Sequence, residues 1–153
     1  MISSQVRQRQ LAELYERDFC QWAEQTAQQL RDGNFSDLDL ANLIEEMEDM
    51  SRSQKRALLS NLRVLLLHLL KLQHQPEKRS SSWRSIIIEH RIRIQDAFEE
   101  SPSLKPYLQS SFNKTYQKAR KQAAAETELP ITTFPEQPNF TMEDALNDEF
   151  IPN

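Results

Sequence analysis

Apolar residues recur every three or four positions along most of this chain, which is the spacing of one face of an α-helix. A single glycine among 153 residues agrees with a helical fold, because sheets and hairpins use glycine in turns with positive φ. Gly33 itself stands where the first helix is expected to end in a left-handed residue. The pattern predicts an all-α fold with five main helices, near residues 9–32, 37–50, 53–74, 82–100 and 103–126.

The third predicted helix is the most apolar of the five. The stretch 62–72 is apolar except for Arg63, His68 and Lys71. A helix that is apolar nearly all round is one that other helices surround. We therefore expect a single domain over residues 1–153, a bundle of about five helices with this helix at its centre.

Two further apolar features are assigned to the core. Cys20 follows Phe19 in the helical pattern, and we expect it to be a small core residue rather than a reactive thiol. The second predicted helix carries one apolar stripe, which we expect to face the bundle interior, while its other faces carry carboxylates. This stripe consists of Leu40, Leu43, Ile44, Met47 and Met50.

The C-terminal segment, about residues 127–153, differs from the rest. Three prolines fall between Leu129 and Phe140, and no helical period is visible there. We expect an extended acidic tail that lies on the bundle or trails from it. Thr141 and Asp144 have the spacing of a capping box, which predicts a short last helix.

Charge is sorted into three blocks. Residues 1–51 hold 4 Lys or Arg against 11 Asp or Glu, residues 52–121 hold 15 against 5, and residues 122–153 hold none against 7. The basic middle block could follow a phosphate backbone. Its aromatic residues, however, keep the core spacing and do not alternate with the basic ones. We therefore favour neutralisation by the acidic second helix and tail, or simple solvation of the charged faces.

The candidate nucleic-acid or anion contacts all belong to this basic block. Lys78, Arg79 and Arg84 lie around the start of the fourth helix, and Arg91 and Arg93 lie further along it. Further cations, Lys114, Lys118, Arg120 and Lys121, lie toward the end of the fifth helix.

Four residues form a candidate buried polar cluster, namely Glu46, His68, Glu89 and His90. Glu46, His68 and His90 border apolar stripes on three different helices, and inward carboxylates and imidazoles can bind a metal in a helical bundle. Their spacing matches no metal-binding pair within one helix. We therefore favour a buried Glu–His hydrogen-bonded pair beside a solvated acidic face, and the metal or acid–base site stays open.

A second chemical hypothesis uses Arg63 and His68. An arginine followed by a histidine at this spacing resembles a motif of helical ribonucleases, in which arginine holds phosphate and histidine transfers a proton. Five residues along a helix place the two side chains about 140° apart, which weakens the hypothesis.

Several separated blocks resemble a known family. They are LYERDFCQWAEQTAQQLRDGNFSDLDLANLIEEMEDM, NLRVLLLHLLKLQHQPEKRSSSWRSIIIEHRIRI and SPSLKPYL, in this order. Together they resemble a mainly cyanobacterial family, domain of unknown function number twenty-nine, over about residues 14–135. The resemblance implies an all-helical fold and supplies no catalytic role. Cys20, Ser51 and Leu72 depart from the residues common in the family.

Taken together, these patterns favour a small cytoplasmic protein without a membrane span or cofactor. We expect a non-enzymatic protein-interaction or regulatory module that has a protein partner, with self-association as a further possibility. The alternatives are an RNA-directed or metal-assisted enzyme, in which His68 acts with Arg63 or Glu46, and a nucleic-acid-binding protein that uses the basic segment 52–121.

Overall fold

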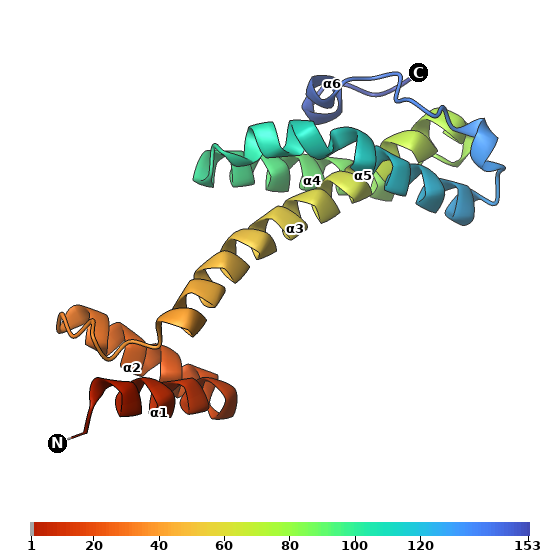
Figure 1. Cartoon of the computed structure of the whole chain (residues 1–153). Coiled ribbons are helices and arrows are strands. Elements are labelled where there is room, and N and C mark those ends of the chain that lie inside the picture. Colours follow the sequence, from red (N-terminus) through yellow and green to blue (C-terminus); the bar gives the residue numbers. More distant parts are fainter. Residues whose placement is uncertain (1) are drawn as a thin grey trace. The chain divides into compact units, whose positions relative to one another are not determined.

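The computed structural model describes residues 2–153, which form six α-helices and no strands (Figure 1). The all-α prediction is confirmed. None of the described helices is both long and apolar enough to cross a membrane. The helices are α1 (Ser4–Arg17), α2 (Phe19–Arg31), α3 (Leu40–His74), α4 (Ser81–Glu100), α5 (Leu104–Thr127) and α6 (Met142–Leu146), with short 3-10 turns at Pro76–Lys78 and Ile131–Thr133.

The chain divides into two compact units, residues up to 53 and residues 54–153, and each has its own apolar core. The single domain expected from the length is thus organised as two such units. The core of the first unit comes from α1, α2 and the beginning of α3. The core of the second comes from the rest of α3, from α4 and α5, and from the C-terminal segment.

The predicted first helix, 9–32, is two helices, so this prediction was wrong. The break lies at Asp18, whose backbone N–H still donates to the Leu14 carbonyl at the end of α1. The Asp18 carboxylate then accepts from the backbone N–H of Gln21, at 3.1 Å, and caps α2. Aspartate favours such a cap over a helix interior, and this preference overrides the continuous apolar period.

The predicted second and third helices are one helix, α3, with 35 residues. The prediction of a boundary near Ser51 or Ser53 was wrong. Neither glycine nor proline occurs between residues 40 and 74, and serine is only mildly unfavourable inside a helix. Asp39 begins the helix instead: its carbonyl accepts from the Leu43 N–H at 3.0 Å.

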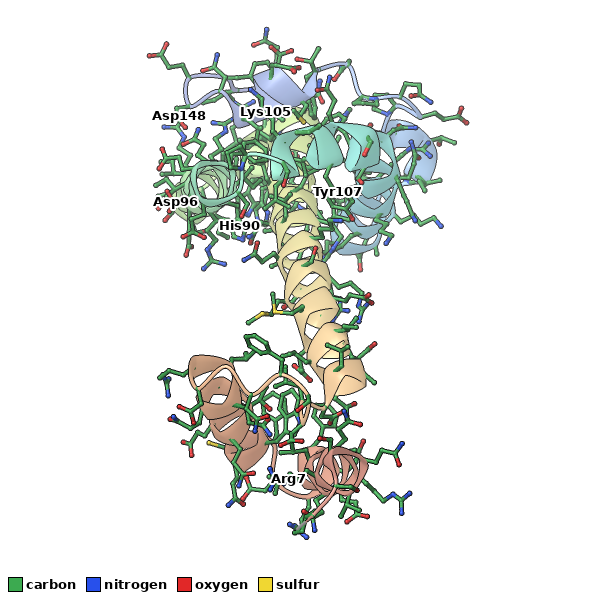
Figure 2. All side chains as sticks on the ribbon, turned by 60° about the vertical axis from the view of Figure 1, so that its left-hand side comes forward. Arg7, His90, Asp96, Lys105, Tyr107 and Asp148 are labelled. Carbon is green, nitrogen blue, oxygen red and sulfur yellow. The ribbon has the colours of Figure 1, made fainter. Side chains whose placement is uncertain are left out.

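The first unit packs Leu11, Leu14 and Trp22 together, with Tyr15, Ala23 and Leu43 partly buried around them. Its helices are tied by polar contacts as well. Trp22 Nε1 donates to the Asp39 carboxylate at 3.1 Å, and Arg7, labelled in Figure 2, donates to Asp37 at 2.8 Å. Between α2 and α3, Gly33 has φ +74°, which confirms the left-handed residue predicted after the first helix segment.

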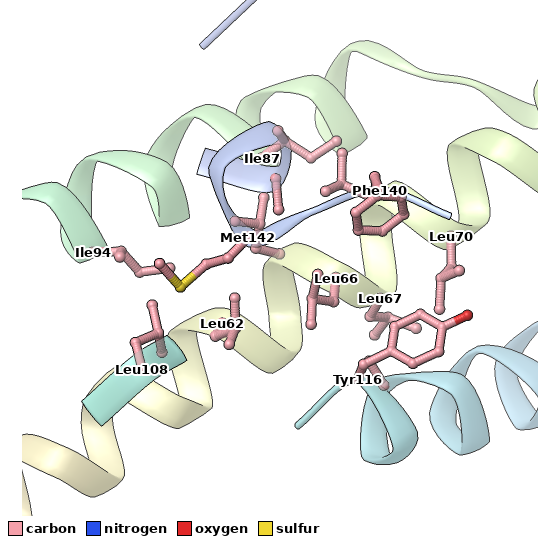
Figure 3. Packing of buried hydrophobic residues seen from close by; sticks show 14 of the residues in the cluster. Leu62, Leu66, Leu67, Leu70, Ile87, Ile94, Leu108, Tyr116, Phe140 and Met142 are labelled. Atoms are coloured by element: carbon pink, nitrogen blue, oxygen red, sulfur yellow. The ribbon is translucent and has the colours of Figure 1, made fainter. Parts of the chain in front are cut away.

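The second unit is built around the apolar part of α3. Its eight buried leucines, at 58, 62, 65, 66, 67, 69, 70 and 72, are at most 2% exposed. Figure 3 shows Ile87 and Ile94 of α4, Leu108 and Tyr116 of α5, and Met142 of α6 on different sides of this helix. The prediction of a central apolar helix is confirmed, although α1 and α2 contribute to the core of the other unit.

The C-terminal segment packs on α4 and α5 of its own unit. Phe134 is fully buried, Phe140 is 5% exposed, and Tyr116 donates its hydroxyl to the Pro135 carbonyl at 2.6 Å. The capping box of Thr141 and Asp144 is present, so the predicted short last helix is confirmed as α6.

Candidate functional site

Four apolar residues that the sequence assigned to the core lie on the surface of the first unit. Leu40, Ile44, Met47 and Met50 of α3 are between 49% and 62% exposed. This part of the core prediction was wrong. Positions three and four residues apart lie side by side on a helix, so these four side chains form one continuous surface, the α3 apolar face.

The side of α3 that packs inside the first unit is a different one. Asp39 and Leu43 lie on it, and Glu46 follows at the same spacing. At 100° per residue, the centre of this packed side is rotated by roughly a quarter of a turn from the centre of the α3 apolar face. Two hydrogen bonds fix this orientation of the helix about its axis, one between Trp22 and Asp39 and one between Tyr15 and Glu46.

One acidic side chain, Glu48, borders the α3 apolar face. Glu45 and Asp49 lie further round the helix, on the side opposite the face. Arg52 binds all three carboxylates, Glu45 at 3.1 Å, Glu48 at 3.4 Å and Asp49 as well. One guanidinium cannot neutralise three carboxylates, so this part of α3 keeps a negative charge.

Glu46 does not pair with a histidine. Its carboxylate accepts from the Tyr15 hydroxyl at 2.5 Å, within the first unit. This hydrogen bond, with burial and the charge of Glu46 acting in the same direction, raises the pKa of Tyr15 to about 12. The predicted Glu–His pair was therefore wrong, because the inward carboxylate finds a phenol instead.

The two histidines each bind a carbonyl of their own helix. His68 Nδ1 is 2.8 Å from the Val64 oxygen, and His90 Nδ1 is 2.8 Å from the Ile86 oxygen. Burial lowers the pKa of His68. His90 lies on α4 (Figure 2), and its neighbour Glu89 pairs with Arg93 at 2.6 Å on the surface. Among residues 2–153 no three His, Cys, Asp or Glu side chains are grouped so that they could hold a metal.

Arg63 and His68 also have separate partners. The Arg63 guanidinium donates to the Gln122 side chain on α5, whereas His68 is buried and bound to α3 itself. Arg63 lines a hollow between α3 and α5, and His68 is not among the residues of that hollow.

Two of the predicted anion contacts hold the second unit together. Arg91 is buried and donates to the carbonyls of Ala145, Asp148 and Phe150 at 2.9, 3.3 and 2.7 Å. Arg79 donates to the Leu72 carbonyl at 3.1 and 3.2 Å and to the Pro152 carbonyl at 3.4 Å. These contacts leave Arg79 and Arg91 few donors for a ligand. Arg93 stays on the surface, where it pairs with Glu89.

Lys78 and Arg84 are exposed. Arg84 lines a hollow of about 230 Å³ with Arg79, Ser80 and Ser81, at the beginning of α4. Cys20 is exposed too, so its assignment to the core was wrong. It belongs to the first turn of α2, and the packed side of that helix is formed by Trp22 and Thr26.

A family model described as "Domain of unknown function DUF29" matches residues 14–151. The chain belongs to this family. The match covers most of both units of the DUF29 chain and includes the whole α3 apolar face. No curated protein and no solved structure matches the chain.

Two surface features of the DUF29 chain, the α3 apolar face and the hollow between α3 and α5, were not predicted from the sequence. The α3 apolar face was visible as a stripe, but the sequence did not show that it would be left uncovered. The hollow between α3 and α5 involves Arg56 and Ser60, which were not singled out. Their spacing from Arg63 on one helix, in a stretch without carboxylates, is the signal that could have found them.

Proposed function

We propose that this DUF29 domain is a protein-interaction module that binds a basic amphipathic helix of a partner protein through the α3 apolar face. The observation that supports this proposal is the exposure of Leu40, Ile44, Met47 and Met50 side by side on one helix. Single exposed apolar residues are ordinary, whereas a contiguous group with a charged border is typical of interaction sites.

The chemistry of the face favours a helical partner. An amphipathic helix places its own apolar residues at the same three- and four-residue spacing, so two such faces can interdigitate. Met47 and Met50 have flexible, polarizable side chains, which adapt to the shape of a partner. A regulatory role would follow if the partner helix is presented only in one state of the partner.

The charge of the face favours a basic partner. Glu45, Glu48 and Asp49 share one arginine, and residues 1–51 hold 11 acidic against 4 basic residues. Lysines and arginines beside the partner's apolar stripe would meet Glu48 at the edge of the face and the net negative charge of this segment, and unlike charges speed association and disfavour acidic competitors. The exposed single cysteine is compatible with the reducing cytoplasm expected from the sequence.

The alternative functions have weaker support from the geometry. His68 is buried and bound to its own helix, and Arg63 binds Gln122, so an acid–base pair of the two has no common open site. Arg79 and Arg91 donate to backbone carbonyls within the second unit, which occupies two of the five predicted nucleic-acid contacts.

The proposal can be tested with synthetic peptides and the full chain. Fluorescence anisotropy would measure binding of a labelled helical peptide with leucines on one face and lysines beside them, and of a second peptide with glutamates in place of the lysines. We expect the basic peptide to bind and the acidic one to bind at least about tenfold more weakly, because of Glu48 and the net negative charge of this segment.

Variants connect this binding to the α3 apolar face. The double substitution Ile44→Ser with Met47→Ser should weaken binding of the basic peptide by about tenfold or more, since each buried CH₂ group contributes roughly 0.8 kcal/mol. Val6→Ser, on exposed α1 surface, is the matched control and should leave binding within about twofold. Equal binding of both peptides, or insensitivity to the double substitution, would overturn the proposal.

Light scattering of the free protein tests whether a second copy of the chain occupies the α3 apolar face. A monomer at the concentrations of the binding assay is the expected result. A dimer that Met47→Ser dissociates would instead assign the α3 apolar face to a second copy of this chain, and it would contradict the basic partner helix.

A further inference from the structure

The second unit has a cationic hollow between α3 and α5, with a volume of about 320 Å³. Arg56 and Arg63 contribute to its lining from α3, and Lys114 and Lys118 contribute from α5. The hollow lies wholly within residues 54–153, on the surface of a packed core.

The periodicity of the two helices places these cations together. Arg56, Ser60 and Arg63 are separated by four and three residues and therefore lie along one side of α3. Lys114 and Lys118 are four residues apart on α5. Two such rows face a common space when the helices that carry them pack side by side, and the hollow is lined by both rows.

No carboxylate belongs to the lining of the hollow. The chain carries no Asp or Glu from residue 50 to 76 or from residue 101 to 125, so the nearby turns of both helices are free of negative charge. The next acidic residue on α5, Glu126, binds Lys71 at 3.0 Å. Like charges that share a small space repel one another, and a bound anion relieves this repulsion.

The cations differ in how they are held. Arg63 is half-buried and fixed by its hydrogen bond to Gln122, which leaves further guanidinium N–H groups for a ligand. Arg56, Lys114 and Lys118 are exposed, and none of them has a hydrogen-bond or ion-pair partner among residues 2–153. This distinguishes them from Arg79, whose donors bind the carbonyls of Leu72 and Pro152.

The other lining residues suit a polar anion. Ser60 is exposed and offers a hydroxyl donor. Thr115 is buried and uses its hydroxyl to bind the Ser111 carbonyl at 2.9 Å, and Leu59 is partly buried. Thr115 and Leu59 thus give the hollow a fixed wall, while the cations and Ser60 provide donors.

We propose that this hollow is a binding site for a compact anion with two linked phosphate groups, either free diphosphate or the diphosphate of a nucleotide. Arg56 and Arg63 are seven residues apart, which corresponds to about 10 Å along a helix. One phosphate group is too short to reach both ends of such a row, whereas a diphosphate can contact cations along its length. The volume is at the lower end of the range for small-molecule sites.

Isothermal titration calorimetry on the full chain at low ionic strength tests this proposal. The probes are inorganic pyrophosphate, orthophosphate, adenosine diphosphate and a short single-stranded oligonucleotide. We expect pyrophosphate to bind with one site per chain and at least about tenfold more tightly than orthophosphate, because it can engage more of the cations at once.

The double variant Arg56→Gln with Lys118→Gln should weaken pyrophosphate binding by about tenfold or more. Lys105→Gln (Figure 2) with Lys121→Gln removes the same two positive charges from positions on α5 outside the hollow, and it should leave binding within about twofold. Circular dichroism of each variant would verify that the helices are intact. Equal weakening in both variants would show a diffuse charge effect and would overturn the site.

The remaining probes identify the source of the phosphates. Equal affinity for pyrophosphate and adenosine diphosphate would support recognition of the phosphates alone, and tighter binding of adenosine diphosphate would support a nucleotide. Absence of pyrophosphate binding would contradict the proposal. So would oligonucleotide binding that is far tighter and steeply dependent on salt, since that is the behaviour of an extended nucleic-acid surface.

Discussion

Charged side chains in both units bind groups outside their own helix or turn, several of them far away in the sequence. Asp37 accepts hydrogen bonds from Arg7 on α1 and from Asn34 in the loop before α3, at 2.8 and 3.0 Å. In the second unit, the buried Arg91 binds three carbonyls of the C-terminal segment. At the scale of single residues, these contacts fix segments that apolar packing alone would leave loosely placed.

Asp37 is expected to make stability depend on pH in the acidic range. Hydrogen bonding by Ser4, Arg7 and Asn34 lowers the pKa of Asp37 from the ordinary 3.8 to about 2. A lowered carboxyl pKa stabilises the fold above the ordinary value, and this contribution is lost as the pH falls from about 4 to about 2. Asp37→Asn should therefore be less stable than the wild type at neutral pH, and the difference should disappear toward pH 2.

Urea unfolding followed by circular dichroism across this pH range would measure the effect. Wild type and Asp37→Asn share every other titratable group, so the difference between their free energies of unfolding reports on Asp37. Asp96→Asn, at an exposed position on α4 (Figure 2), is the control and should track the wild type at every pH. A stability difference for Asp37→Asn that stays constant with pH would contradict this assignment.

Arg91 is expected to be essential for anchoring the C-terminal segment. Arg91→Leu removes the donors of three carbonyls and should destabilise the second unit by roughly 2–4 kcal/mol, because buried acceptors lose charged partners. Hydrogen exchange should rise most in residues 142–151. Arg93→Leu removes an exposed ion pair on the same helix and should cost no more than about 1 kcal/mol. Similar losses in the two variants would argue against the anchoring role.

At the scale of elements, the two ends of α3 lie in different environments. The eight leucines buried between residues 58 and 72 are enclosed by other segments, whereas Leu40, Ile44, Met47 and Met50 remain exposed. The same kind of side chain therefore contributes to stability at one end of the helix and offers a binding surface at the other.

This contrast predicts that truncating an apolar side chain has a large effect on stability at one end of α3 and a small effect at the other. Leu66→Ala should cost about 2–5 kcal/mol, since it removes buried contacts and leaves a cavity. Met47→Ala should change the free energy of unfolding by no more than about 0.5 kcal/mol, because its side chain is already exposed. Equilibrium unfolding in urea would measure both, and a large loss for Met47→Ala would show that the α3 apolar face is covered within the protein.

At the scale of the whole molecule, the chain has two cores and one helix that contributes to both. The first unit combines a small apolar cluster with hydrogen bonds of Trp22, Tyr15 and Arg7. The second has the larger core and carries the cationic hollow. The two proposed binding sites thus belong to different units.

Because the two units have separate cores, a substitution that destabilises one unit should increase local unfolding mainly in that unit. In the Leu66→Ala variant, amide hydrogen exchange should accelerate more in residues 54–153 than in residues 2–53, because local openings follow the cooperative unit that has lost contacts. Mass spectrometry of peptides from each unit would measure the exchange. Equal acceleration in both units would show that the chain unfolds as one.

Local patterns of the sequence determined much of this structure. The helical class, the enclosed part of α3, the left-handed Gly33 and the capping box of α6 all follow from spacing and from the preferences of single residues. Such features depend on interactions between residues that are close in the chain. Two helix boundaries were predicted wrongly. Asp18 ends a helix although the apolar pattern continues past it, and the helix continues through Ser51.

The tertiary structure decided which side of each helix is packed and which side is exposed. At the beginning of α3, Asp39 and Glu46 reach Trp22 and Tyr15, so the helix packs on a partly polar side and leaves its most apolar side exposed. The hollow arises in the same way, because α5 brings Lys114 and Lys118 to the side of α3 that carries Arg56 and Arg63. Contacts between residues so distant in the sequence depend on how helices pair, which periodicity within one helix does not encode.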